Sequence, residues 1–285
     1  MDRKEFLKKG ILSAGAAVAI GAVGAQAESE KTPEIVGSNH IPNQPVIMKE
    51  NMLIHKAATR GHADHGWLNT WHSFSFANYY NAERMNFGVL RVLNDDWVAP
   101  GRGFSTHPHD NMEIITIPLN GDLEHKDSMG NGTIIKSGDV QVMSAGSGIY
   151  HSEFNPNGDV PVELLQIWVF PNKRNVTPRY DQITLPAVVR NTWQQILSPN
   201  PDDTGVWIHQ DAWFHIGTLD KDQELEYQVK RQGNGVYAFV IEGGAIIGDE
   251  TLAKRDAAGI WNTTSFKVKA TESSRILLMD VPMKQ

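Results

Sequence analysis

The sequence predicts an all-β protein of two tandem β-barrels of jelly-roll type, preceded by an N-terminal export signal. Three observations support this fold class. Short runs rich in Val, Ile, Thr and Phe are closed by Gly, Asn, Asp or Pro; a second series of such runs follows the first; and helical periodicity is absent from the runs. With 285 residues, the chain is long enough for two modest cores.

Residues 1–27 are predicted to be a signal peptide that is cleaved before Glu28. Four basic residues precede the weakly hydrophobic run ILSAGAAVAIGAVG, which is too short to span a bilayer, and the segment ends in the small-x-small pattern Ala25-Gln26-Ala27. The stretch RKEFLK also resembles the twin-arginine export motif, with Lys4 in place of the second arginine, so that route and the general secretory route both stay open. We expect a periplasmic protein without a stable membrane anchor after cleavage; an uncleaved anchor is the alternative.

The rest of the chain divides into a linker and two β units. Residues 28–45 are polar and rich in Pro and Asn, which is typical of a linker. The first barrel is expected over residues 46–175, in the runs FGVLRVLNDDWV, MEIITIPLNGDLEHKD, GTIIKSGDVQVMSAG and VELLQIWVFP. After a break at residues 171–186, the second barrel is expected over residues 185–285, in the runs WFHIGTLD, VYAFVIEGG, GIWNTTSFKVKA and RILLMDVP.

Charge and cysteine content restrict the class of partner. The formal net charge is -7 and no block of five or six basic residues occurs, so the sequence does not support binding to a nucleic acid. The chain has no cysteine, which leaves histidines and carboxylates as the strong metal ligands. We expect a monomer that binds a small molecule.

Two pairs of potential metal ligands stand at the same spacing, His107-Pro108-His109 and His151-Ser152-Glu153. In a strand, residues two apart point to the same face with Cα atoms roughly 6.5 to 7 Å apart, so both side chains of a pair can reach one ion. Pro108 cannot donate to a sheet ladder, which predicts a strand start or an irregularity there rather than the middle of a sheet. Three imidazoles and a carboxylate suit Fe(II), Mn, Co, Ni, Cu(II) or Zn.

The alternation of side chains along the first strand does not decide which carboxylate is the fourth metal ligand. If the strand that contains His107 continues unbroken, Glu113 lies at an even offset from both histidines and also faces inward. Glu113 and Glu153 then compete for the ion, and the carboxylate left over is available as a general base or as a hydrogen-bond partner of an imidazole.

Four further histidines are weaker candidates. They can line the mouth of the pocket or bind a second ion, although isolated histidines more often make ordinary hydrogen bonds; they are His62, His65, His72 and His125. The aromatic stretch from Trp67 to Tyr80 is interpreted as core packing.

The spacing of these motifs resembles the cupin superfamily. Gly101-x5-His107-x-His109-x3-Glu113-x7-Gly121 is similar to the first cupin motif, and Gly138-x5-Ser144-x-Gly146 followed by His151-x3-Asn155 is similar to the second. The departures from the cupin pattern, together with THPHDNMEIIT, MSAGSGIYHSEFNP and HGWLNTWHSFSFANYYN, resemble bacterial members of the pirin family described as quercetin dioxygenases. The resemblance extends from about residue 48 to the C-terminus.

The resemblance implies a bicupin with one divalent metal ion in the first barrel and none in the second. Its ligands would be His107, His109, His151 and Glu153, with Glu113 nearby but unbound. Fe(II) is the first choice of metal, with Mn, Ni, Co, Cu or Zn as alternatives. The implied activity is quercetinase-like: a flavonol or related aromatic substrate binds through a hydroxyl, Glu153 (or Glu113) takes its proton, and O2 cleaves the ring with loss of carbon monoxide. The rival hypothesis is a non-catalytic redox sensor of the same family.

Overall fold

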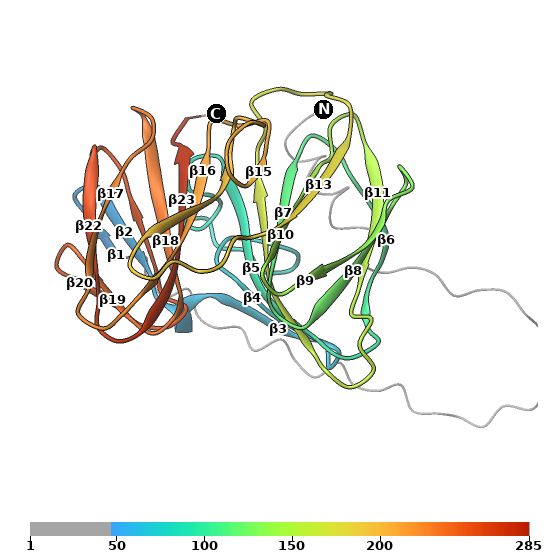
Figure 1. Ribbon diagram of the computed structural model, residues 1–285, viewed down its shortest axis with the longest axis horizontal. Helices are drawn as coiled ribbons and strands as arrows, with labels where there is room; N and C mark the ends of the chain where they lie inside the picture. Colours follow the sequence, from blue (N-terminus) through green and yellow to red (C-terminus); the bar gives the residue numbers. More distant parts are fainter. Residues whose placement is uncertain (1–46, 285) are drawn as a thin grey trace, which may run out of the picture. The chain divides into compact units, whose positions relative to one another are not determined.

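Strands make up most of the computed structural model, which describes residues 47–284 (Figure 1). These residues form strands β1 to β23 in four sheets, with a single turn of 3-10 helix, η2 (Ala57–Thr59). The all-β prediction is therefore confirmed. None of the helical structure in this part of the chain is long and apolar enough to cross a membrane. The predicted signal peptide (1–27) and linker (28–45) lie outside the described residues.

The first barrel consists of a seven-stranded sheet, in the order β13-β10-β7-β12-β5-β4-β3, facing a four-stranded sheet, β6-β11-β8-β9. Alternate side chains of the two sheets meet in an apolar cluster of Leu68, Val98, Leu123, Ile135, Val162 and Leu164. The strands are β3 Gly61–Asp64, β4 Leu68–His72, β5 Leu90–Val98, β6 Gly103–His109, β7 Glu113–Asn120, β8 Asp122–Asp127, β9 Gly132–Lys136, β10 Asp139–Ser144, β11 Ile149–Phe154, β12 Val162–Val169 and β13 Arg179–Thr184.

The second barrel pairs an eight-stranded sheet, in the order β1-β2-β21-β18-β23-β16-β14-β15, with a four-stranded sheet, β17-β22-β19-β20. A core that includes Tyr227, Val240, Val268 and Leu278 fills the space between them. The strands are β1 Ile47–Lys49, β2 Met52–His55, β14 Trp193–Ser198, β15 Val206–Trp207, β16 Trp213–Leu219, β17 Glu224–Gln228, β18 Asn234–Glu242, β19 Ala245–Ile247, β20 Glu250–Leu252, β21 Ala257–Ile260, β22 Ser265–Ala270 and β23 Ser274–Pro282.

Three strands lie where the predicted boundaries did not place them. Strands β1 and β2, expected in the first barrel (46–175), join the second, where β2 pairs antiparallel with β21 and Ile54 enters the second core. In Figure 1 these blue strands lie beside the red and orange strands of the second barrel. Strand β13 forms within the predicted break and pairs with β10. Each addition covers a sheet edge that would otherwise expose unpaired backbone groups.

The two barrels share a further apolar cluster. Leu93, Ile115 and Leu165, on the outer face of the seven-stranded sheet, belong to the same buried cluster as Phe214 and Phe239 of the second barrel. Strands β5, β7 and β12 are therefore apolar on much of both faces, as strands covered on both sides must be.

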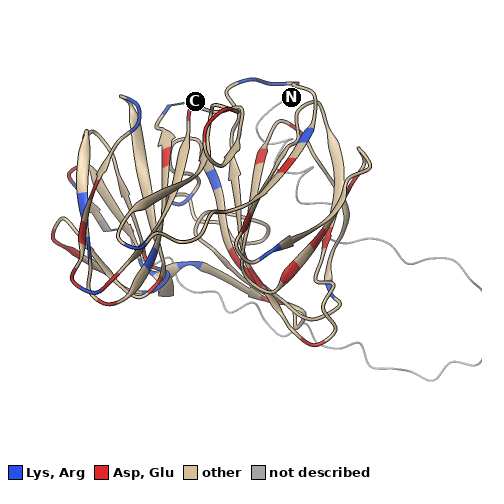
Figure 2. Ribbon diagram, in the orientation of Figure 1, with Lys and Arg blue, Asp and Glu red and all other residues tan. Residues whose placement is uncertain are grey.

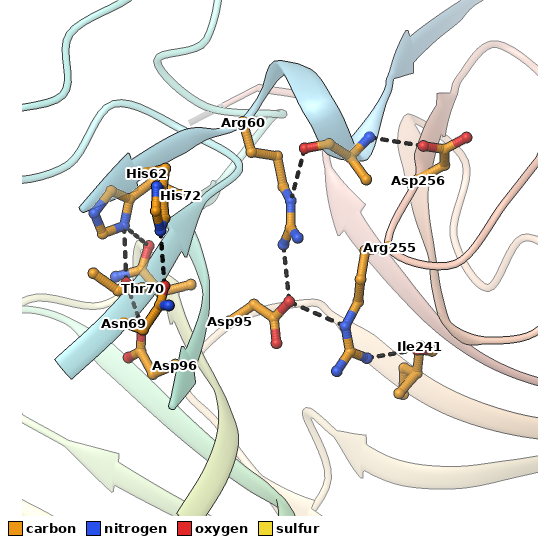
Figure 3. A network of polar contacts seen from close by, with 12 residues as sticks. Arg60, His62, Asn69, Thr70, His72, Asp95, Asp96, Ile241, Arg255 and Asp256 are labelled. Carbon is orange, nitrogen blue, oxygen red and sulfur yellow. Dashed lines mark hydrogen bonds and ion pairs between the residues drawn. The ribbon is translucent and has the colours of Figure 1, made fainter. Parts of the chain in front are cut away.

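Charged groups also join the barrels. Asp95 Oδ2 accepts from Arg60 Nη1 at 3.1 Å and lies 3.0 Å from Arg255 Nε, so arginines from both halves converge on one carboxylate (Figure 3). Elsewhere, Lys and Arg are spread over both barrels and intermixed with Asp and Glu (Figure 2).

Candidate metal centre

The structure brings His107, His109 and His151 together inside the first barrel. His107 and His109 lie on β6, and His151 lies on β11, directly opposite His107 in the antiparallel register. The ring centroids are 4.9 Å apart for His107 and His109, 4.4 Å for His107 and His151, and 4.8 Å for His109 and His151. One nitrogen of each imidazole can therefore lie within 4.8 Å of a nitrogen of the other two. Strand β6 is an edge strand, and this accommodates Pro108.

The protonation of these imidazoles suits metal binding. Burial, and then the charges of the neighbouring histidines, lowers the pKa of His109 to about 3 and that of His151 to about 2, so both rings are neutral at pH 7 and keep a lone pair. The Nδ1 of His107 lies 2.8 Å from the carbonyl oxygen of Ser105, to which it donates, and this leaves Nε2 as the acceptor. Both nitrogens of buried His151 lack a protein hydrogen-bond partner. Such orphaned nitrogens fit a set of ligands for a divalent metal.

Glu153 lies next to this cluster on β11. Its carboxylate, the His151 ring and the His125 ring of β8 place their ligand atoms within 4.8 Å of one another, so His151 is common to two groups of candidate ligands. His151 lies opposite His107 and Glu153 lies opposite Phe104, so the extra residue at this register shift is on β6 and β11 stays regular. Both carboxylate oxygens accept from Gln166 Nε2 at 3.1 Å. Glu153 is therefore buried, held in one orientation and adjacent to the histidines.

Gln166 is itself held by its strand neighbours. Thr116 of β7 lies opposite Gln166 of β12, and its hydroxyl donates to Gln166 Oε1 at 3.2 Å. This bond turns the amide nitrogen toward Glu153. Sequence reasoning missed Gln166, because an isolated glutamine carries no motif; its position inside the apolar run VELLQIWVFP is the one signal that could have singled it out.

His125 is buried beside His151 and Glu153. Its side chain is fully buried, its Nε2 lies 3.3 Å from Asp127 Oδ2, and its Nδ1 has no protein partner. The ring of Tyr180 covers it at 4.8 Å. The period of two along β8 puts His125 on the same inward face as Leu123, and this is the sequence signal; its place opposite Glu153 depends on the pairing of β8 with β11.

Glu113 lies outside both groups, and the expectation that it faces inward is wrong. The strand does not continue unbroken: β6 ends at His109, Asn111 has a φ of 48°, and β7 begins at Glu113 in the other sheet. Glu113 instead accepts from the Ser144 hydroxyl at 2.7 Å, on the face that carries Ile115 toward the second barrel. Burial raises the pKa of this carboxyl to about 7, against the opposing effect of the Ser144 hydrogen bond.

The remaining candidate histidines lie in three different places: inside the barrel, on its outer face and in a turn. His72 lies inside the barrel, where its Nδ1 is 2.9 Å from Asn94 Oδ1, and Thr70 beside it donates to buried Asp96 (Figure 3). His62 lies on the outer face, stacked on Trp71 at 4.0 Å and bonded to Asn69 at 2.8 Å. His65 is in the turn between β3 and β4. None of these three belongs to either group of candidate ligands within residues 47–284.

Aromatic side chains complete the wall beside the histidines. The Trp168 ring meets His109 edge to face at 4.9 Å and Phe76 at 5.4 Å. The Trp168 Nε1 atom is buried and has no protein partner. Part of the predicted aromatic stretch therefore contributes to the surroundings of the site as well as to the core.

Two stacked barrels, with three imidazoles and a carboxylate inside the first, define a cupin with a histidine-rich candidate metal centre. Comparison with known proteins narrows this class. The family model described as Pirin matches residues 54–169, and the model described as the quercetinase C-terminal cupin domain matches residues 195–281. This chain belongs to the pirin family.

Related proteins align with this chain over most of their own length. The chain is 42% identical over 231 residues to quercetin 2,3-dioxygenase of Escherichia coli, covering 81% of this chain and 99% of that protein. It is 38% identical to a pirin-like protein of Caulobacter vibrioides, covering 77% and 95% of the two chains. Among solved structures, the bacterial pirin YhhW of Escherichia coli in complex with nickel(II) matches with a TM-score of 0.77 and 41% identity, covering 81% of this chain and 99% of that one.

Proposed function

We propose that this protein is a metal-dependent dioxygenase of the quercetinase type, which uses O2 to cleave a flavonol or a related aromatic substrate. The observation that carries the proposal is the convergence of His107, His109 and His151 beside Glu153. The names of the relatives support the reaction class. The structure of YhhW with nickel(II) supports a divalent ion in this family.

His107, His109, His151 and Glu153 would hold the ion, and Fe(II) is our first choice among the metals that such a set accepts. When bound, the ion supplies Lewis acidity and redox chemistry for the reaction with O2. His151 has no other protein partner to satisfy its nitrogens, and Gln166 fixes the carboxylate without donating to any imidazole.

Glu153 is also the candidate proton acceptor. A substrate hydroxyl that reaches the histidines comes close to the Glu153 carboxylate, which can accept its proton at an Oε atom. Burial of Glu153 and His151 keeps bulk water away from this transfer. Trp168 and Phe76 offer an aromatic wall on which a planar substrate ring can pack.

The test is turnover with quercetin. The chain from Glu28 onward is loaded anaerobically with Fe(II), and separately with Mn, Ni, Co or Cu, and O2 consumption and carbon monoxide release are measured. We expect stoichiometric carbon monoxide that disappears in His107→Ala and persists in His62→Ala, a matched control whose ring lies on the outer face of the same barrel. A tightly bound ion without turnover by any metal form would refute the quercetinase activity and favour either a different small substrate or the redox-sensing alternative.

A further inference from the structure

A deeply buried charged side chain at the junction of the barrels is Arg84, in the loop between β4 and β5. Its side chain is 1% exposed. The Nη2 atom donates to the Thr59 hydroxyl, whereas Nε and Nη1 are buried without a protein partner. A buried guanidinium with unpaired N–H groups is costly, because it has lost water without gaining an acceptor.

The ion pairs at the junction do not compensate this charge. Asp95 already binds both Arg60 and Arg255, as Figure 3 shows. No Asp or Glu within residues 47–284 forms an ion pair with Arg84. Arg84 therefore adds a positive charge to the junction that no carboxylate in the described part of the chain compensates.

The polar groups around Arg84 are donors as well. His55 Nδ1 lies 2.8 Å from the Tyr237 hydroxyl, and burial raises the pKa of Tyr237, so this hydroxyl keeps its proton, and we assign it as the donor to Nδ1. Burial, and then the charge of Arg84, lowers the pKa of His55 to about 3, so the ring is neutral and its remaining proton is on Nε2. That Nε2 is buried and has no protein partner.

Ser73 adds a hydroxyl to the same set. Its side chain is 1% exposed, and its Oγ is buried without a hydrogen-bond partner although it lies close to the Tyr237 hydroxyl. Arg84, His55 and Ser73 thus supply four unpaired polar atoms around one tyrosine, and the two nitrogens of Arg84 and the one of His55 can only donate.

We propose that Arg84, His55 and Ser73 form a binding site for one small monovalent anion, chloride in the first instance, between the two barrels. Three N–H donors and a hydroxyl, with a single uncompensated positive charge, select an anion over a cation or a metal. A monovalent ion neutralises that charge, whereas sulfate would leave a net negative charge and loses more hydration free energy on burial. The proposal does not depend on the dioxygenase activity.

The test is the unfolding temperature of the whole chain as chloride replaces gluconate at constant ionic strength. An ion that binds the native state stabilises it with the logarithm of its concentration, so each tenfold rise in chloride above its Kd should raise the Tm by roughly 3 to 5 °C. Arg84→Met should abolish this dependence. The matched control, Arg190→Met, removes an exposed arginine paired with Asp220 and should keep it.

Two further measurements test the proposal even if the Arg84→Met variant does not fold. Ser73→Ala removes one hydrogen bond to the ion and should raise the chloride concentration of half-maximal effect by about tenfold. In wild-type crystals soaked in bromide, an anomalous peak is expected within hydrogen-bonding distance of Arg84 Nε or Nη1. The same Tm in chloride and gluconate, or a bromide map without a peak at Arg84, would overturn the proposal.

Discussion

Replacing Gln166 by leucine should weaken metal binding although Gln166 is not itself a ligand. The amide nitrogen of Gln166 donates to both oxygens of Glu153 at 3.1 Å, and Thr116 holds the amide in that orientation at 3.2 Å. Leucine is similar in size and apolar, so Gln166→Leu removes the donors without opening a large cavity. The Glu153 carboxylate then loses the contact that orients it toward the histidines.

The magnitude follows from the two contacts. A hydrogen bond to a charged group contributes about 1.5 to 3 kcal/mol, and substitution of a residue that orients a metal ligand weakens metal binding by about 10- to 100-fold. A 10- to 100-fold loss corresponds to about 1.4 to 2.7 kcal/mol, so the two ranges agree. The Thr116 hydroxyl also loses its acceptor, which should lower the free energy of unfolding by about 1 kcal/mol.

The assay is competition of the protein with a metal chelator, with Gln141→Leu as the matched control. Gln141 lies in the same cross-strand row, opposite Thr116, and is also buried, but its Nε2 has no protein partner. Metal affinity should therefore fall in Gln166→Leu and stay at the wild-type level in Gln141→Leu. Equal affinity in all three folded proteins would show that the amide does not position Glu153.

Three other outcomes are expected. Glu153→Ala should lose most of the bound metal on dialysis while Glu113→Ala retains it; the reverse order, read by elemental analysis, would overturn the ligand assignment. Because the folded-state pKa of Glu113 is raised from its ordinary 4.5 to about 7, the native state holds the extra proton, and stability falls as pH rises between these values. Relative to Glu113→Gln, the wild type should lose roughly 3 kcal/mol over that window in urea titrations, and parallel curves would contradict the shift. Periplasmic protein should begin at Glu28; an intact Met1 in the cytoplasm would refute the predicted export.

The cluster of histidines could be predicted because it depends on local geometry. His107 and His109 are two residues apart within one unbroken strand, and so are His151 and Glu153, so the period of the strand alone places each pair on one face. The same local rules located most strands, because turn residues closed each apolar run.

Glu113 shows where this reasoning ends. Its spacing from His109 is correct for one face only if the backbone continues as a strand, and Asn111, with a φ of 48°, breaks that continuity. After the break the chain enters a different sheet, so the alternation of side chains along β6 does not predict on which face of β7 Glu113 lies.

The sequence by itself determined the β class, the tandem arrangement of two barrels and the residues able to bind a metal, since these follow from composition, period and turn chemistry. Only the tertiary structure decided that β1 and β2 complete the second barrel, that Gln166 orients Glu153, that His125 lies beside Glu153 and that Arg84 is buried without a carboxylate. Each of these depends on which distant strands become neighbours. Neighbouring strands are selected by burial and edge pairing over the whole barrel, and no local spacing in the sequence records that selection.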